Sequence, residues 1–244
     1  HHAKLTAYHD VRSGILHADE VADAKRDLPD AVFRELYLAE PSDDEGNPFG
    51  LEHIRQCLAP LSEAPPVAWG IDLARSVDWT VAIGLDAEGR VCRFARWQSP
   101  WEETHQRLLA LVGETAALVD CTGTGDAPFE RLQRQGGGQF QGYLFTSASK
   151  QRLVEGLAVA MQHREVWLPD GPIRSELESF EYVYSRSGGV RYSAPDGLHD
   201  DCVIALALAV AHWQAAYRRT PLHIVSLDDA GADRARRVAL AWSA

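Results

Sequence analysis

The feature of this sequence that most constrains its fold is the apolar segment 202–211, which directly follows two adjacent aspartates, Asp200 and Asp201. A helix that is apolar on every face belongs in the interior of a domain. The segment is too short to cross a membrane, and His212 follows it directly. Two carboxylates therefore stand where a core helix begins, and we expect them either to cap this helix or to hold a metal ion.

Upstream of this helix, the hydrophobic pattern predicts a mixed β-sheet flanked by helices. Three short apolar stretches joined by tight turns indicate an antiparallel three-strand meander, after which strands alternate with helices. A meander followed by crossover connections is the layout of a ribonuclease-H-like sheet of the α/β class. The expected strands are 67–73, 79–85, 90–97, 116–120 and 143–145, with a hairpin of 181–186 and 190–194, and the expected helices are 100–112, 128–135, 149–163 and 172–180.

The chain divides into three parts on this interpretation. Residues 1–62 have helical spacing and polar loops but no alternation for a sheet of their own, and we expect a linker or the tail of an upstream domain. Residues 63–221 begin with a Pro-rich linker and carry the whole predicted sheet. Residues 222–244 form a short charged tail.

Composition narrows the classes of function. The four cysteines form no Cys-x-x-Cys pair, which argues against zinc and against a disulfide framework and indicates an intracellular protein. The sequence shows no secretory signal and no membrane span. The net charge of −11 at first disfavours a nucleic-acid partner. A site built from aspartates, however, carries charge that a bound cation offsets, so net charge does not decide the partner.

Acidic residues lie where three apolar core elements end or begin. Asp72 ends the first strand, Asp120 ends the fourth, and Asp200 and Asp201 begin the last helix. Taken singly, each could be a turn or cap residue, but the carboxyl ends of neighbouring parallel strands form sites in α/β sheets. Such a cluster would bind two Mg²⁺ or Mn²⁺ ions and hydrolyse a phosphodiester. Successive helical residues point about 100° apart, so we expect Asp201 to bind metal directly and Asp200 to be either an outer ligand or an alternate one.

Other charged residues leave alternatives open. Asp78 is either an outer ligand or a turn residue, and His199 either shuttles a proton or simply adjoins the helix start. Lys150 begins a helix, where the dipole disfavours a cation, so it either faces an anion such as phosphate or is a solvated surface residue. Glu176 and Glu178 are expected to be solvated on a polar helix face.

Five stretches of the chain follow one another in an informative order, and they are Trp69-Gly70-Ile71-Asp72, Asp78-Trp79-Thr80, Leu118-Val119-Asp120-Cys121-Thr122-Gly123-Thr124-Gly125, Ser149-Lys150 and residues 192–207. In this order they resemble the C-terminal nuclease domain of the large terminase subunit of tailed bacteriophages. The resemblance covers residues 67–215, and residues 31–58 are similar to the end of the ATPase region and the linker of that family.

The resemblance implies a ribonuclease-H-like, divalent-metal-dependent DNA endonuclease that cuts concatemeric viral DNA during genome packaging in the host cytoplasm. It implies metal binding by Asp72, Asp120 and one or both of Asp200 and Asp201, and a hairpin at 181–194 near double-stranded DNA. Its implied partners are the ATPase domain of the same protein, the portal and the small terminase subunit. Expected DNA contacts are Lys150, Arg152, Arg186 and Arg191.

One departure from the family is large. The chain contains no Gly-x₄-Gly-Lys-Ser/Thr loop, so we expect no bound nucleotide, and ATP hydrolysis cannot come from this chain alone.

Two other functions stay open on the sequence. Gly70-Ile71-Asp72 before a hairpin also resembles the first phosphate loop of actin-like sugar kinases, although this chain is too short for their second domain. A non-catalytic DNA-binding or motor-docking module with a structural aspartate cluster is the non-enzyme alternative. A rise in melting temperature on adding Mn²⁺ would argue against that module.

Overall fold

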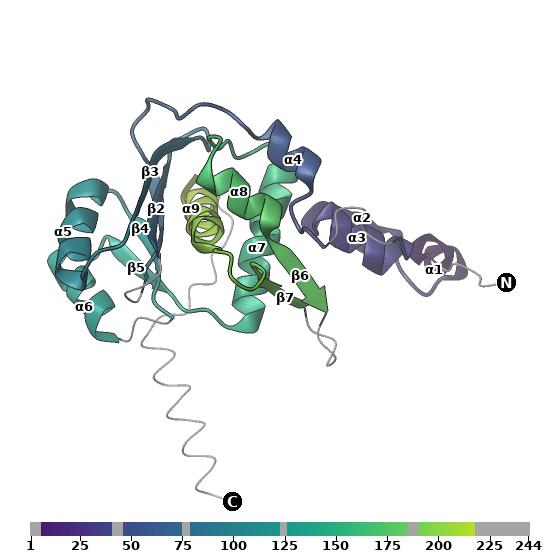
Figure 1. The fold of residues 1–244 in the computed structure, drawn as a ribbon. Coiled ribbons are helices and arrows are strands. Elements are labelled where there is room, and N and C mark those ends of the chain that lie inside the picture. The colour runs from purple at the N-terminus through teal and green to yellow at the C-terminus, as the bar shows by residue number, and fades with distance from the viewer. Residues whose placement is uncertain (1–5, 41–45, 75–78, 123–125, 185–189, 218–244) are drawn as a thin grey trace, which may run out of the picture.

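The computed structural model describes residues 6–40, 46–74, 79–122, 126–184 and 190–217, and its centre is a five-stranded sheet (Figure 1). The strands are β1 (Ala68–Asp72), β2 (Thr80–Leu85), β3 (Val91–Trp97), β4 (Ala117–Asp120) and β5 (Phe140–Tyr143). They lie in the order β3-β2-β1-β4-β5. β1, β2 and β3 pair antiparallel, whereas β1–β4 and β4–β5 are parallel. The predicted mixed sheet of a meander plus parallel strands is confirmed.

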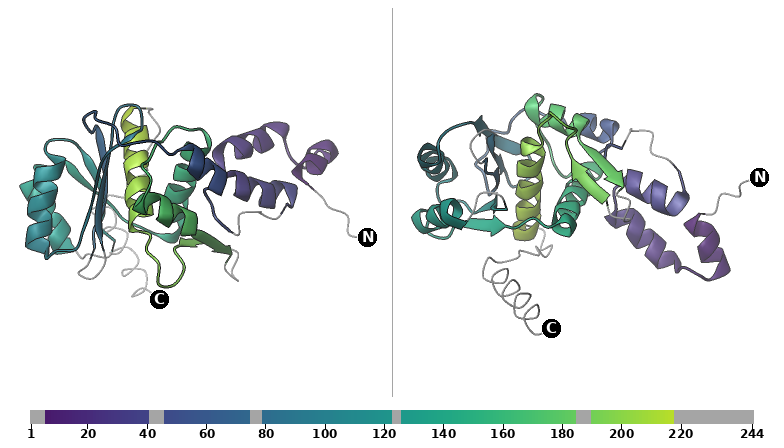
Figure 2. Two further views of the ribbon diagram at one scale, coloured as in Figure 1. Left: turned by 45° about the horizontal axis from the view of Figure 1, so that its top comes forward. Right: turned by 60° about the horizontal axis from the view of Figure 1, so that its bottom comes forward.

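Helices cover both faces of the sheet (Figures 1 and 2). α5 (Trp101–Val112) and α6 (Asp126–Gln135) lie on one face, and α9 (Asp201–Tyr217) and α7 (Ser147–Gln162) lie on the other. α9 is enclosed between the sheet and α7, and its residues 202–210 are all buried, as its all-apolar pattern predicts. Within the described ranges, neither α9 nor any other helix is long and apolar enough to span a membrane.

Side-chain alternation along the strands separates two cores. Ile71 of β1 lies in the core beneath α5 and α6, whereas Leu118 of β4 lies in the core around α9. Successive side chains of a strand point to opposite faces. Asp72, next to Ile71, and Asp120, two residues after Leu118, therefore belong to the face that α9 covers.

α9 approaches β1 closely at Gly70. A Cβ atom on this residue would lie 2.1 Å from the carbonyl oxygen of Ala205 and 2.1 Å from the backbone nitrogen of Ala209. Only glycine permits so close an approach of a strand to a helix backbone. This contact fixes α9 across the strand that ends in Asp72.

The edge strand is displaced from its prediction. We expected a strand at 143–145, but β5 spans Phe140–Tyr143. The chain leaves the sheet after Tyr143, because the Phe145 N–H donates to Thr122 Oγ1 at 2.7 Å rather than to a neighbouring strand. The apolar residues after Tyr143 suggested a strand, whereas the true strand contains Gln141 and Gly142, which an edge position tolerates.

The N-terminal part is helical, as expected. Its helices are α1 (Ala7–Ser13), α2 (Ala18–Asp27), α3 (Asp30–Leu38) and α4 (Leu51–Gln56). α1, α2 and α3 enclose a small core that includes Val21 and Phe33. Ile54 of α4 and the preceding Phe49 instead join the main core around α9. The group α1–α3 therefore has a core of its own, whereas Phe49 and α4 belong to the main core.

A short helix and a hairpin connect α7 to α9. α8 (Pro172–Ser179) packs against α9, and β6 (Glu181–Tyr184) pairs antiparallel with β7 (Val190–Ser193) beside α7 (Figure 2). The predicted hairpin is thus present. Two residues of interest from the sequence, Arg186 and Asp78, lie outside the described residues.

Candidate metal centre

Two aspartates end neighbouring parallel strands. Asp72 is the last residue of β1 and Asp120 is the last residue of β4. The register of the two strands pairs Ile71 with Val119, so one further step places Asp72 level with Asp120. Because both belong to the α9 face, their carboxylates converge at the carboxyl edge of the sheet, as the sequence predicts.

A local turn orients Asp120. Its Oδ1 accepts the Thr122 N–H at 2.8 Å, a contact typical of aspartate at the start of a turn. The Thr122 hydroxyl oxygen in turn accepts the Phe145 N–H, which ties the end of β4 to the chain after β5. The carboxylate is therefore held by the Thr122 N–H, and Thr122 is in turn held by the connection after β5.

Asp200 directly precedes α9 and faces a lysine. Its carbonyl oxygen accepts the Ile204 N–H at 2.9 Å, which makes Asp200 the N-terminal cap position of the helix. Its side chain, however, accepts a hydrogen bond from Lys150 Nζ at 3.0 Å. Lys150 comes from the first turn of α7, whose start is capped by the Thr146 hydroxyl. The cation that the helix dipole disfavours there is thus paired with an aspartate.

Asp201 is the first residue of α9 and is more enclosed, with a side chain 14% exposed. Its Oδ2 lies 3.9 Å from Arg96 Nη2 and 3.4 Å from His199 Nδ1. Arg96 comes from β3 and lies over the Trp79 ring, 4.5 Å from the ring centroid. Asp201 therefore has two cationic or potentially cationic neighbours, Arg96 and His199.

The carboxylates raise each other's pKa values. Burial, then the charges of Asp120, Asp201 and Asp200, raises the pKa of Asp72 well above its ordinary range, with Lys150 opposing. Burial also raises the pKa of Asp120, against its hydrogen bonds with Thr122. Burial, followed by the nearby Glu176, raises the pKa of Asp201 to about 6. The site therefore concentrates more negative charge than the described cations neutralise.

This donor set fits a hard divalent cation. Within the described part of the chain, the Asp72 carboxylate has no hydrogen bond or ion pair, although it is desolvated by its surroundings. Buried carboxylates normally have partners. As they stand, no three His, Cys, Asp or Glu side chains of the described residues form a ready metal-binding group; Asp120 accepts the Thr122 N–H and Asp200 pairs with Lys150. An ion bound between them would draw these oxygens together.

Sequence reasoning missed Glu176. We expected it to be solvated, but its side chain is only 9% exposed, and it accepts the Cys202 N–H at 2.7 Å. Glu178, expected to be equally solvated, is half-buried and pairs with Arg174 at 2.8 Å. The helical spacing of Ile173 and Leu177, both buried, places Glu176 on their side of α8 and could have identified it.

The expected DNA-contacting residues lie on separate elements. Lys150 is half-buried in its pair with Asp200, whereas Arg152 on α7 and Arg191 on β7 are exposed. The Tyr192 hydroxyl donates to Glu155 at 2.9 Å and joins the hairpin to α7. The elements that carry the two exposed arginines are thereby held side by side.

Comparisons with known proteins agree with this fold. The family model of the terminase RNaseH-like domain matches residues 69–212. The large terminase subunit of Thermus virus P23-45 is 32% identical over 204 residues, which are 77% of this chain and 42% of that protein. That of Thermus phage G20c is 31% identical over the same shares. The chain thus spans less than half the length of these relatives.

Solved structures give the same result in three dimensions. The large terminase nuclease of phage G20c with bound magnesium superposes with a TM-score of 0.61 at 26% identity, over 70% of this chain and 98% of that one. The same nuclease with bound cobalt gives a TM-score of 0.61 at 27% identity over the same shares. The nuclease domain of Thermus phage P74-26 gives 0.58 at 26% identity, over 67% and 95%. This chain belongs to the terminase RNaseH-like domain family.

Proposed function

We propose that this chain is the nuclease part of a large terminase subunit, an endodeoxyribonuclease that cuts concatemeric viral DNA during genome packaging with divalent metal. The observation that carries the proposal is the convergence of Asp72 and Asp120 from parallel strands with Asp200 and Asp201 at the start of α9. Family membership and the metal-bound relatives support the same conclusion.

Asp72, Asp120 and Asp201 would hold the metal, with Asp200 as an alternate ligand. When bound, two Mg²⁺ or Mn²⁺ ions would activate water and stabilise the leaving oxygen of a phosphodiester. Carboxylate oxygens suit these hard ions better than zinc, which prefers sites with His or Cys. Asp78 as an outer ligand and His199 as a proton carrier beside Asp201 remain part of this proposal.

Basic side chains would position the DNA. Arg152 on α7 and Arg191 on β7 are exposed to meet phosphates, and Arg186 follows β6 in sequence. Lys150, paired with Asp200, would exchange that carboxylate for a phosphate oxygen when metal binds Asp200. These contacts recognise the backbone, so cleavage would have little base specificity.

The remaining expectations concern the whole protein. We propose that residues 1–62 are the linker or the end of an ATPase domain, that 63–221 are the nuclease, and that 222–244 are a tail. The chain covers 42% of a curated relative, which leaves room for an ATPase domain elsewhere in the full protein. Portal and small terminase subunit as partners, and the host cytoplasm as location, follow from the packaging role.

The test is plasmid cleavage in Mn²⁺ by the chain and by Asp72→Ala and Asp120→Ala. Loss of cleavage in both variants, with unchanged circular dichroism, is expected, because each removes a metal ligand. Asp170→Asn is the matched control, since Asp170 is exposed and pairs with Arg174 away from the site. Full cleavage by either site variant would contradict the proposal. Mn²⁺-independent DNA binding without cleavage would support a docking module, and ATP binding without cleavage would support a phosphotransferase.

A further inference from the structure

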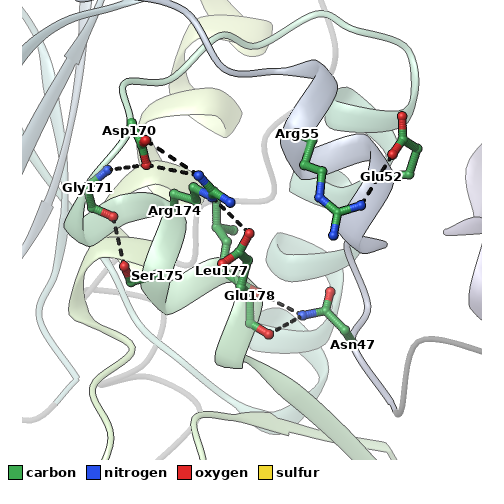
Figure 3. A network of polar contacts seen from close by, with 9 residues as sticks. All are labelled: Asn47, Glu52, Arg55, Asp170, Gly171, Arg174, Ser175, Leu177 and Glu178. Carbon is green, nitrogen blue, oxygen red and sulfur yellow. Dashed lines mark hydrogen bonds and ion pairs between the residues drawn. The ribbon is translucent and has the colours of Figure 1, made fainter.

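Glu176 connects α8 to the first turn of α9. One of its carboxylate oxygens accepts the Cys202 N–H at 2.7 Å, and the other lies 3.3 Å from Arg96 Nη2. The end of α8 is itself anchored, because the Asn47 side-chain amide donates to the Leu177 carbonyl at 2.7 Å (Figure 3). Glu176 therefore reaches α9 from a fixed element, although it belongs to none of the strands or helices that carry the aspartates.

This contact replaces a missing helix cap. The second N–H of a helix is normally bonded by the side chain of the residue that precedes the helix. Here that residue is Asp200, whose carboxylate is bonded to Lys150 instead. Glu176 accepts the N–H of Cys202, the second residue of α9, in its place. Asp200 is thereby released from capping and can face the other carboxylates.

Arg96 is shared unequally between two carboxylates. Its Nη2 lies 3.3 Å from Glu176 Oε1 but 3.9 Å from Asp201 Oδ2. Its guanidinium is confined against the Trp79 ring, and its side chain is only 19% exposed, so it has little freedom to move elsewhere. With Glu176 present, the stronger pair is Arg96–Glu176. Without the Glu176 charge, Asp201 would be the nearest anion for Arg96.

We propose that Glu176 is a positioning residue of the metal centre, which caps α9 and holds Arg96 away from Asp201 so that the Asp201 carboxylate stays available to a divalent cation. The inference rests on the proposed function, because the cation is the one assigned to that site. An arginine paired tightly with Asp201 would compete with this cation for the same oxygens.

The Glu176→Gln variant removes the charge of this side chain but keeps an oxygen that can cap α9. The amide oxygen of glutamine can still accept the Cys202 N–H, but it attracts Arg96 less strongly than a carboxylate does. Glu178→Gln is the matched control, because Glu178 lies two residues away on α8 and pairs with Arg174 outside the site (Figure 3). Both variants remove one negative charge from the same helix.

The experiment is calorimetric titration of the 244-residue chain with Mn²⁺ alone, with thermal unfolding in EDTA as a check of folding. We expect Glu176→Gln to raise the Mn²⁺ dissociation constant about tenfold, as loss of a group that orients a metal ligand does. Glu178→Gln should bind like the unaltered chain. Adding Arg96→Gln to Glu176→Gln should restore most of the lost affinity, because it removes the competing cation.

Each other outcome overturns the inference. Unchanged Mn²⁺ affinity in Glu176→Gln would leave Glu176 only a helix cap. Lost affinity that Arg96→Gln does not restore would make Glu176 a ligand itself. If Glu176→Gln does not fold, the Arg96→Gln variant decides. It is expected to bind Mn²⁺ at least as tightly as the unaltered chain does, and weaker Mn²⁺ binding would contradict the positioning role of Glu176. Failure of the unaltered chain to bind Mn²⁺ or to cleave DNA would instead refute the proposed function.

Discussion

The aspartates of this site are held in surroundings that oppose their charge. Asp72 and Asp201 are desolvated and lie near other carboxylates, and both pKa values are raised. This crowding of carboxylates lowers the stability of the metal-free protein, and a bound cation would offset it. Functional sites commonly combine lower stability with a binding or catalytic role in this way. Charge-removing substitutions here should therefore stabilise the metal-free chain.

Asp201→Asn should raise the metal-free melting temperature at neutral pH. The pKa of Asp201 is about 6 in the folded chain, above its ordinary value of 3.8. A raised carboxyl pKa gives stability that is present below the unfolded-state pKa and is lost as pH rises through the folded-state value. The gain over the unaltered chain should thus be roughly 1 to 3 kcal/mol above pH 7 and should vanish towards pH 4.

Thermal unfolding in EDTA at several pH values measures this difference. Comparison of variant with unaltered chain at each pH cancels other titrating groups, such as the buried His212, whose pKa is lowered by burial. Asp196→Asn, an exposed position in the loop before α9, should show no such pH-dependent gain. A less stable Asp201→Asn chain at pH 7.5 would show that the charge of Asp201 is already compensated without metal.

The elements that form the site were largely predictable because their signals are local. The all-apolar run of α9 and the short, almost wholly apolar runs of β1, β2 and β4 are patterns that lie within one segment each. The start of β5 was not predictable, because Gln141 and Gly142 in this strand are tolerated only at the sheet edge, and the edge is defined only in the assembled sheet. The partnership of Glu176 with Arg96 likewise joins α8 to β3, far apart in sequence.

Gly70→Ala should unfold the chain or destabilise it by several kcal/mol, since overpacking against backbone costs at least about 1–3 kcal/mol. The new methyl group would lie 2.1 Å from backbone atoms of Ala205 and Ala209, which cannot move without shifting α9. Denaturant unfolding followed by circular dichroism measures the change.

Gly156→Ala is the matched control for this substitution. Gly156 lies within α7, and a Cβ atom there meets nothing within 4 Å. Alanine is favoured over glycine in a helix by about 1 kcal/mol, so this variant should be as stable as the unaltered chain or more so. Equal stability of Gly70→Ala and Gly156→Ala would contradict the close packing of α9 on β1.

The molecule as a whole consists of a sheet with two helical layers and an N-terminal group of helices. α1, α2 and α3 share a small core of their own (Figure 2). Phe49, Ile54 and Cys57, by contrast, are fully buried in the main core, and the Gly46 carbonyl accepts the Tyr182 N–H at 2.8 Å. The part of the proposed linker from Gly46 onward therefore packs into the core of the sheet domain.

Two truncated chains should separate the contribution of residues 1–45 to folding from that of residues 46–62. Removal of residues 1–45 should leave a folded chain whose melting temperature still rises on adding Mn²⁺, because the main core stays complete. Removal of 1–62 also deletes Phe49 and Ile54, each worth about 2–5 kcal/mol, against a total stability of about 5–15 kcal/mol. That chain should not fold. Equal melting temperatures of the two truncated chains would contradict this division.

The most direct test of the metal centre is anomalous scattering from crystals of the chain soaked in Mn²⁺. We predict two peaks about 4 Å apart, bridged by the carboxylates of Asp72, Asp120 and Asp201. Ordered crystals with no peak among these aspartates, or with Mn²⁺ bound only elsewhere, would contradict the account.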